Sequence, residues 1–193
     1  MLRLFARTNP LKHPQASFWF RPDSVTARKT DPSIMSWLRD QGSLTRRLVN
    51  RCGPDFSVRL VGQQWIKPRI EEALLLNIPP RQKVLLRQVQ LLCGAQVLVY
   101  ARSIIPLQTL RGRHRHLKYL GDKPLGGYLF AHPDLIRDHQ QIARILPKDP
   151  LFDIALSGSR HDCECIWGRR SLFRIGAKSL LVSEFFLPGV LRH

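Results

Sequence analysis

Three charged side chains occur on strand-like segments whose other residues on the same face are apolar. In LLVSEFFLP, residues 180–188, Glu184 alternates with leucine, valine and phenylalanine. Arg87 occupies an equivalent place in KVLLRQVQLL, and Arg102 does so in VLVYARSII. An ionised side chain is rarely buried without a partner, because removing its charge from water is costly. Each of the three therefore needs either an ion pair or a bound ligand.

Two interpretations of this pattern remain open from the residues alone. In the first, Glu184 forms a structural ion pair with Arg87 or Arg102. In the second, the charged residues line an apolar pocket in which an arginine binds an anion and the carboxylate handles a proton or a hydroxyl group. Arginine suits the bidentate binding of a carboxylate, so the second interpretation predicts a small anionic ligand.

The composition is that of a globular protein with anionic partners. The chain has 193 residues, of which 44% are hydrophobic and 23% charged, and its formal net charge is +17. This length suggests one domain, and the positive charge attracts anions over a long range without identifying them. No apolar run approaches the roughly 20 residues of a membrane span, and no secretory signal is evident, so we expect a cytoplasmic protein.

Neither the cysteines nor the basic segments follow a pattern that is specific for a metal or for nucleic acid. Cys52, Cys93, Cys163 and Cys165 are expected to be reduced thiols. The segment HDCEC could hold a metal through His161 and the last two cysteines, but it lacks paired CxxC spacing, and we interpret it as a loop. The segment LRGRHRHLKYLG could bind nucleic acid, but it has few aromatic residues, and we favour a solvated basic loop.

The residues around these sites alternate between helical and extended patterns. Residues 1–30 are interpreted as a basic, partly ordered N-terminal extension and residues 31–193 as the folded domain. Asp31 and Ser43 are expected to begin two short helices. A helix is also expected after Pro133, and a loop or insertion at 147–165. Meandering strands with segregated helices predict a single antiparallel α+β domain, with strands at 56–66, 83–94, 96–106, 166–175 and 179–187.

Four sequence blocks, in this order, resemble one known family. They are WLRDQGSLTRRL, then LLRQVQLL followed by ARSIIP, then LGDKPLGGYLF, and finally IWGRRSLFRIGAKSLLVSEFFLP. Together they are similar to the bacterial chorismate pyruvate-lyases over roughly residues 31–188. The resemblance implies a six-stranded antiparallel sheet with flanking helices and an enclosed ligand site.

The resemblance also assigns site residues, position by position. The arginine that binds the ligand carboxylate falls on Arg87, and the active-site glutamate falls on Glu184. A leucine whose backbone contacts the ligand, in the PLG segment of a flap, falls on Leu125. A second arginine near the entrance falls on Arg102. The methionine of the family's SMT flap segment is Leu44 here, a change that keeps volume and apolarity.

The activity implied by the resemblance is the conversion of chorismate to 4-hydroxybenzoate and pyruvate, at the start of ubiquinone biosynthesis. Formation of the aromatic ring drives this reaction, so neither a cofactor nor a metal is expected. Arg87 would bind one carboxylate of chorismate, and Arg102 would bind the enolpyruvyl carboxylate or guard the entrance. Glu184 would hydrogen-bond the ring hydroxyl or take part in proton transfer. We expect a monomer with small-molecule partners, chorismate and 4-hydroxybenzoate, no nucleic acid and no membrane span.

A second function class remains as the alternative. A related fold serves as the ligand-sensing effector domain of certain bacterial transcription regulators, which do not catalyse a reaction. Such a protein would need a helix-turn-helix domain before residue 31, and we judge thirty proline-containing residues too few for one. The presence of both Arg87 and Glu184 also favours the enzyme.

Overall fold

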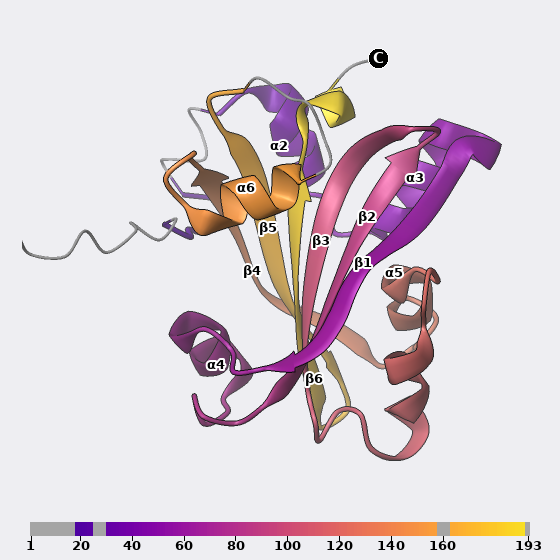
Figure 1. Ribbon diagram of the computed structural model, residues 1–193, viewed down its shortest axis with the longest axis vertical. Coiled ribbons are helices and arrows are strands. Elements are labelled where there is room, and N and C mark those ends of the chain that lie inside the picture. The colour runs from indigo at the N-terminus through magenta and orange to yellow at the C-terminus, as the bar shows by residue number, and fades with distance from the viewer. Residues whose placement is uncertain (1–17, 25–29, 158–162, 192–193) are drawn as a thin grey trace, which may run out of the picture.

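The architecture is a single antiparallel sheet with helices on both faces, as seen in a computed structural model that describes residues 18–24, 30–157 and 163–191 (Figure 1). In these residues the sheet has six strands in the order β1-β2-β3-β6-β5-β4. The predicted α+β class and six-stranded sheet are therefore confirmed. The strands are β1 (Phe56–Ile66), β2 (Val84–Cys93), β3 (Gln96–Pro106), β4 (Leu135–Ile145), β5 (Ile166–Ile175) and β6 (Lys178–Phe186).

Five of the six strands lie where the sequence pattern predicts them, and strand β4 corrects the prediction. The β2–β3 hairpin turns at Gly94, whose φ of 58° lies in the left-handed region that favours glycine. The segment after Pro133, however, is strand β4 and not a helix. It pairs with β5 over most of its length, with a register shift between Asp138 and Gln141. This irregularity breaks the period-2 pattern in the sequence, and pairing with a distant strand decides the conformation.

The helices form two groups that cover opposite faces of the sheet. Figure 1 shows α3 and α5 on one side and α4 and α6 on the other. Helices α2 and α3 share an apolar cluster with the face that carries Val89 and Phe186, whereas α4 and α6 pack on the opposite face. The helical segments are α2 (Pro32–Leu38), α3 (Leu44–Cys52), η1 (Gly53–Asp55), α4 (Ile70–Leu76), η2 (Gly112–Tyr119), α5 (Leu125–Leu129), α6 (Pro150–Leu156) and η3 (Pro188–Leu191).

Local capping chemistry accounts for where several helices begin. The side chains of Asp31 and Ser43 accept hydrogen bonds from backbone N–H groups in the first turns of α2 and α3, as predicted. Asp149 caps α6 in the same way, and Pro150 follows as the first helical residue. The prediction of a loop throughout 147–165 is thus wrong for its first part. His161, part of the candidate metal segment, lies outside the described residues.

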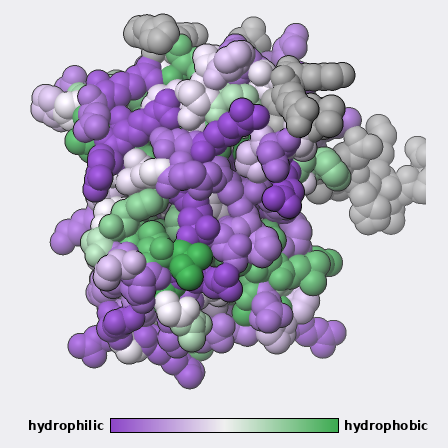
Figure 2. Space-filling model, turned by 180° about the vertical axis from the view of Figure 1, so that it is seen from behind, coloured by the Kyte–Doolittle hydropathy of each residue, from purple (hydrophilic) through white to green (hydrophobic). Residues whose placement is uncertain are grey.

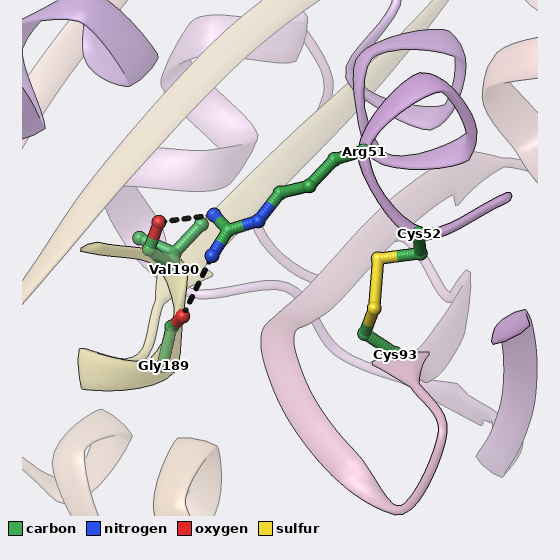
Figure 3. The surroundings of a disulfide bond; sticks show 5 residues. All are labelled: Arg51, Cys52, Cys93, Gly189 and Val190. Carbon is green, nitrogen blue, oxygen red and sulfur yellow. Dashed lines mark hydrogen bonds between the residues drawn. A yellow bond between two sulfur atoms is a disulfide. The ribbon is translucent and has the colours of Figure 1, made fainter. Parts of the chain in front are cut away.

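The expectation of reduced thiols is wrong for two cysteines. Cys52, at the end of α3, and Cys93, at the end of β2, form a disulfide with a Cα–Cα distance of 5.5 Å (Figure 3). Arg51, beside this bond, donates hydrogen bonds to the carbonyl groups of Gly189 and Val190. The C-terminal end of α3 is therefore attached both to the β2–β3 hairpin and to η3. The sequence did not show the pairing because these cysteines meet only when α3 packs beside the hairpin.

Part of the predicted N-terminal extension packs on the sheet. Phe20 forms an antiparallel bridge with Ile142 on the outer side of β4, with backbone hydrogen bonds of 2.8 and 2.9 Å. The ring of Trp19 contacts the edge of Phe185. A helix with the length and apolarity required to cross a membrane does not occur among the described residues.

Candidate active site

A cavity lies between the sheet and the α3 and α5 helices. Its walls are mostly apolar, and the ionisable side chains among its lining residues are Arg87, Arg137 and Glu184. This combination of apolar walls and a few polar groups is typical of small-molecule sites. The other lining residues are Leu44, Thr45, Val89, Leu91, Ala101, Ser103, Pro124, Leu125, Gly126, Leu129, Phe130, Phe173 and Val182.

Glu184 lies in the middle of β6, between Ala101 of β3 and Arg169 of β5. Its Oε2 atom accepts a hydrogen bond of 2.6 Å from Nε of Arg169, whose side chain is fully buried. The predicted ion pair with Arg87 or Arg102 is therefore corrected, because the partner is Arg169. Glu184 also lines the cavity, so it takes part in an ion pair and a candidate site together. The alternation in WGRRSLF would have placed Arg169 on an inward face if the register between β5 and β6 had been known.

Arg87 reaches the cavity from β2 and is 1% exposed. Its terminal nitrogen Nη2 donates to the carbonyl groups of Gly121 (2.9 Å) and Lys123 (2.8 Å), in the loop before α5. Its Nε is buried and has no hydrogen-bond partner among the described residues. Burial lowers the pKa of this guanidinium, and the nearby Asp122 opposes the shift. Arg87 thus connects the sheet to the helix above it and keeps an unsatisfied N–H for an anion.

Arg137 is a third charged residue of the cavity, and the sequence pattern did not indicate it. It comes from β4, in the segment for which a helix had been expected. Its guanidinium lies 4.9 Å from the ring centre of Phe173 and 5.3 Å from that of Phe130. Burial, with a further contribution from the positive charge of Arg169, lowers the pKa of Arg137 to about 10. Arg137 therefore remains a cation at neutral pH.

Leu44 and Leu125 lie where α3 and α5 meet above the sheet. Each is the first residue of its helix, is almost fully buried and lines the cavity. The first N–H groups of a helix have no acceptor within the helix, so the backbone N–H of Leu125 can serve a ligand. A methyl group added at Gly126 would lie 2.9 Å from Oγ1 of Thr45, which shows how closely the two helices approach. Both predicted flap residues therefore belong to this cavity.

Arg102 does not line the cavity, contrary to expectation. It lies on the opposite face of the sheet and forms two hydrogen bonds with Glu72 of α4, at 3.0 and 3.2 Å. Both side chains are almost fully buried. Its neighbours in β3, Ala101 and Ser103, face the cavity, and alternation along the strand directs residue 102 away. Tyr100 and Ile104, two of the apolar residues expected beside Arg102, do pack on that other side of the sheet. Leu98, the third, packs instead in the cluster of α2 and α3, because the register of β2 and β3 shifts at this point.

Comparison with known proteins connects this site to one enzyme family. The model of the chorismate lyase family matches residues 13–192. A probable chorismate pyruvate-lyase of Methylococcus capsulatus is 44% identical over 156 residues, which cover 81% of this chain and 95% of that protein. A probable chorismate pyruvate-lyase of Methylobacillus flagellatus is 42% identical over 156 residues, which cover 81% of this chain and 87% of that protein.

Solved structures with a similar fold include effector domains of bacterial regulators. The effector domain of PhnF from Mycobacterium smegmatis has a TM-score of 0.54 at 14% identity, and the match covers 78% of this chain and 91% of that one. A GntR-family transcriptional regulator from Bacillus cereus has a TM-score of 0.52 at 9% identity, covering 70% of this chain and 93% of that one. At these identities the similarity shows the fold alone.

Proposed function

The chain belongs to the chorismate lyase family, and from this we propose that it converts chorismate to 4-hydroxybenzoate and pyruvate. The observation that carries the proposal is the meeting of Arg87 and Glu184 in one cavity beneath α5. These residues are far apart in the sequence, and each lies on a different strand of the sheet. A cation and a carboxylate in an apolar enclosure suit a ring with a carboxylate at one end and a hydroxyl group at the other.

The reaction requires one proton to leave the ring and one bond to break. Loss of the C4 proton supplies the electron pair for the new ring double bond, while the C3–O bond breaks and its electrons leave with enolpyruvate. A proton then adds to the methylene carbon of enolpyruvate and gives pyruvate. No electrons are gained or lost overall. The protein has to hold the ring, exclude water and assist the movement of the proton. Positioning alone can lower such a barrier by several kcal/mol, up to about 7–11 kcal/mol in ideal cases.

Arg87 is proposed to bind the ring carboxylate together with the backbone N–H of Leu125. The buried Nε of Arg87 lacks a partner among the described residues, and a carboxylate would provide one. Because Arg87 also donates to Gly121 and Lys123, the same side chain links ligand binding to the position of α5. Leu44 and the apolar side chains around it would cover the ring.

Glu184 is proposed to contact the C4 hydroxyl group, either to orient the ring or to move a proton. Arg169 holds its Oε2 at 2.6 Å, which fixes the carboxylate at the edge of the cavity. A fixed carboxylate is a suitable acceptor for a hydroxyl group or for a proton in a positioned substrate. Production of 4-hydroxybenzoate by this chain would supply the first aromatic intermediate of ubiquinone biosynthesis, and we include that role in the proposal.

The test is direct turnover by the purified protein. Incubation with chorismate should give 4-hydroxybenzoate and pyruvate in equal amounts, with the first measured by chromatography and the second by a coupled dehydrogenase assay. An Arg87→Ala variant prepared in parallel controls for contaminating lyase. Failure of the folded wild-type protein to form either product would refute the proposal. Tight binding of 4-hydroxybenzoate without turnover would support the ligand-sensing alternative.

A further inference from the structure

The cavity holds two cations without a carboxylate partner among the described residues. Arg169 is neutralised by Glu184 at 2.6 Å. Arg87 and Arg137 form no ion pair with any described carboxylate, and both are bound by backbone carbonyl groups instead. A ligand with one negative charge would leave one of these two guanidinium groups without an ion-pair partner. The electrostatics of the site therefore suit a dianion.

We propose that Arg137 binds the second carboxylate of the substrate, the one on the enolpyruvyl side chain, and so distinguishes the dianionic substrate from the monoanionic product. This inference rests on the proposed lyase function. It gives Arg137 the role that the family resemblance suggested for Arg102, whose guanidinium is bound to Glu72 on the other face of the sheet.

The position of Arg137 relative to Arg87 fits this role. In the order β2-β3-β6-β5-β4, the two arginines stand four strand spacings apart, or about 19 Å along the sheet between their backbones. Both side chains line the same cavity, and they reach it from strands on different sides of β6, the strand that carries Glu184. Two carboxylates on different parts of one ring could thus each meet a separate guanidinium.

The position of Arg137 relative to Glu184 fits as well. Arg137 and Arg169 donate to the same carbonyl group, that of Asp40, at 2.9 and 2.8 Å, so their guanidinium groups lie side by side. Glu184 is bound to Arg169 and acts electrostatically on Arg137. In chorismate the ether carbon C3 is bonded to the hydroxyl carbon C4. The group that binds the enolpyruvyl carboxylate should therefore lie near the group that binds the hydroxyl, as Arg137 lies near Glu184.

The side chain of Arg137 is held in place but retains capacity for an anion. Its Nη1 and Nη2 atoms donate to the carbonyl groups of Asp40 and Gly42, respectively, and the rings of Phe130 and Phe173 flank the guanidinium. Its Nε is buried without a hydrogen-bond partner among the described residues. The two carboxylates that act electrostatically on Arg137 are engaged elsewhere, Glu184 with Arg169 at 2.6 Å and Asp40 with Arg47 at 3.2 Å.

The experiment compares binding of a monoanion and an unreactive dianion. The monoanion is 4-hydroxybenzoate, and the dianion is 4-hydroxybenzoate with a carboxymethoxy group at C3, which carries the second carboxylate without a bond that can be eliminated. Dissociation constants are measured by calorimetry for wild type, Arg137→Met and Arg137→Lys. Arg144→Met is the matched control, because Arg144 is an exposed arginine of the same strand outside the cavity.

Arg137→Met should weaken binding of the dianion at least tenfold and binding of 4-hydroxybenzoate less than threefold. Arg137→Lys, which keeps the charge, should recover part of the loss, and Arg144→Met should bind both ligands as wild type does. With chorismate, the Arg137→Met variant should show the same tenfold or greater rise in KM. Equal weakening of both ligands, or no weakening of either, would overturn the role of Arg137. Because these are binding measurements, they test the role of Arg137 even if the wild-type protein fails to turn over chorismate.

Discussion

At the scale of single residues, Glu184 combines two properties that the sequence presented as alternatives. It is ion-paired with a fully buried arginine, and it faces the cavity. Removing one partner of a buried pair is strongly destabilising, by about 3–5 kcal/mol, because it leaves an unpaired charge. Activity of Glu184 variants must therefore be expressed per folded molecule.

We predict that Glu184→Ala lowers kcat per folded molecule at least tenfold. Glu184→Gln separates the two proposed roles, because glutamine can hydrogen-bond a hydroxyl group but cannot accept a proton at neutral pH. A fall of roughly 10²–10⁴ in the glutamine variant would indicate proton transfer, and near-normal activity would indicate orientation of the ring. Glu72→Ala is the matched control, since Glu72 is also a buried, arginine-paired carboxylate but lies on the other face. Wild-type activity in folded Glu184→Ala would eliminate Glu184 from the site.

Arg87 of β2 and Arg102 of β3, two buried arginines on neighbouring strands, provide a second pair of variants. Arg87→Met should weaken binding of 4-hydroxybenzoate by about 1.5–3 kcal/mol, the range for a hydrogen bond with a charged group. Arg102→Met should leave that affinity unchanged, because its guanidinium binds Glu72 away from the cavity. Fluorescence titration of both folded variants gives the comparison. Equal losses in the two would contradict the separation of the two faces.

At the scale of elements, the contact between α3 and α5 closes the cavity. Gly126 of α5 faces Thr45 of α3 so closely that an alanine Cβ would lie 2.9 Å from Oγ1. Overpacking of this kind typically costs about 1–3 kcal/mol. We predict that Gly126→Ala displaces α5 and speeds dissociation of 4-hydroxybenzoate about fivefold or more, as measured by stopped-flow fluorescence.

Two further variants make this prediction specific to the helix contact. Gly127→Ala should leave the dissociation rate unchanged, because its added methyl group would meet only Pro124 at 3.9 Å, an ordinary contact distance. Adding Thr45→Ala to Gly126→Ala should restore slower dissociation by removing the hydroxyl group. If Gly127→Ala releases product as fast as Gly126→Ala, the closure does not depend on this contact.

The disulfide attaches the other end of α3 to the sheet (Figure 3). Cys52 and Cys93 are separated by 41 positions, and in the chain-entropy model a crosslink of this span adds about 4 kcal/mol to the free energy of unfolding. We predict that reductant lowers the free energy of unfolding by an amount of this order, measured by denaturant titration. As a control, the Cys163→Ser/Cys165→Ser variant should lose the same free energy of unfolding when reductant is added. Equal stability of oxidised wild type and of Cys52→Ser/Cys93→Ser would contradict the prediction.

At the scale of the whole molecule, positive charge predominates. The chain has 31 lysines and arginines against 14 aspartates and glutamates, and the face in Figure 2 is largely hydrophilic. Such an excess raises the local concentration of anions and accelerates their association. The effect operates through the field of the entire surface, and no individual surface residue is required for it.

We therefore predict that the association rate of 4-hydroxybenzoate falls with ionic strength. Between about 0.01 M and about 1 M salt the Debye length shortens from about 30 to about 3 Å, and the rate should fall on the order of tenfold. The uncharged 4-hydroxybenzamide serves as the control and should associate at a rate nearly independent of salt. A parallel decline for both ligands would show that salt acts on the protein and not on attraction of the anion.

The sequence alone determined those features that depend on neighbouring residues. Period-2 alternation identified five of the six strands, and Asp31 and Ser43 marked two helix starts. The same alternation identified Glu184 and Arg87 as unusual, and the motif blocks led to the family that the comparisons then showed. These inferences succeeded because pleating and capping act over only a few residues.

Tertiary structure decided everything that depends on which face of the sheet a residue shares with distant partners. Arg87 and Arg102 have similar apolar neighbours along their own strands, yet the antiparallel register directs them to opposite faces. Pairing of β5 with β6 gave Glu184 its partner Arg169, and pairing of β4 with β5 turned an expected helix into the strand that carries Arg137. Alternation fixes the two faces within one strand. Only hydrogen bonding between strands far apart in the sequence fixes how those faces align across the sheet.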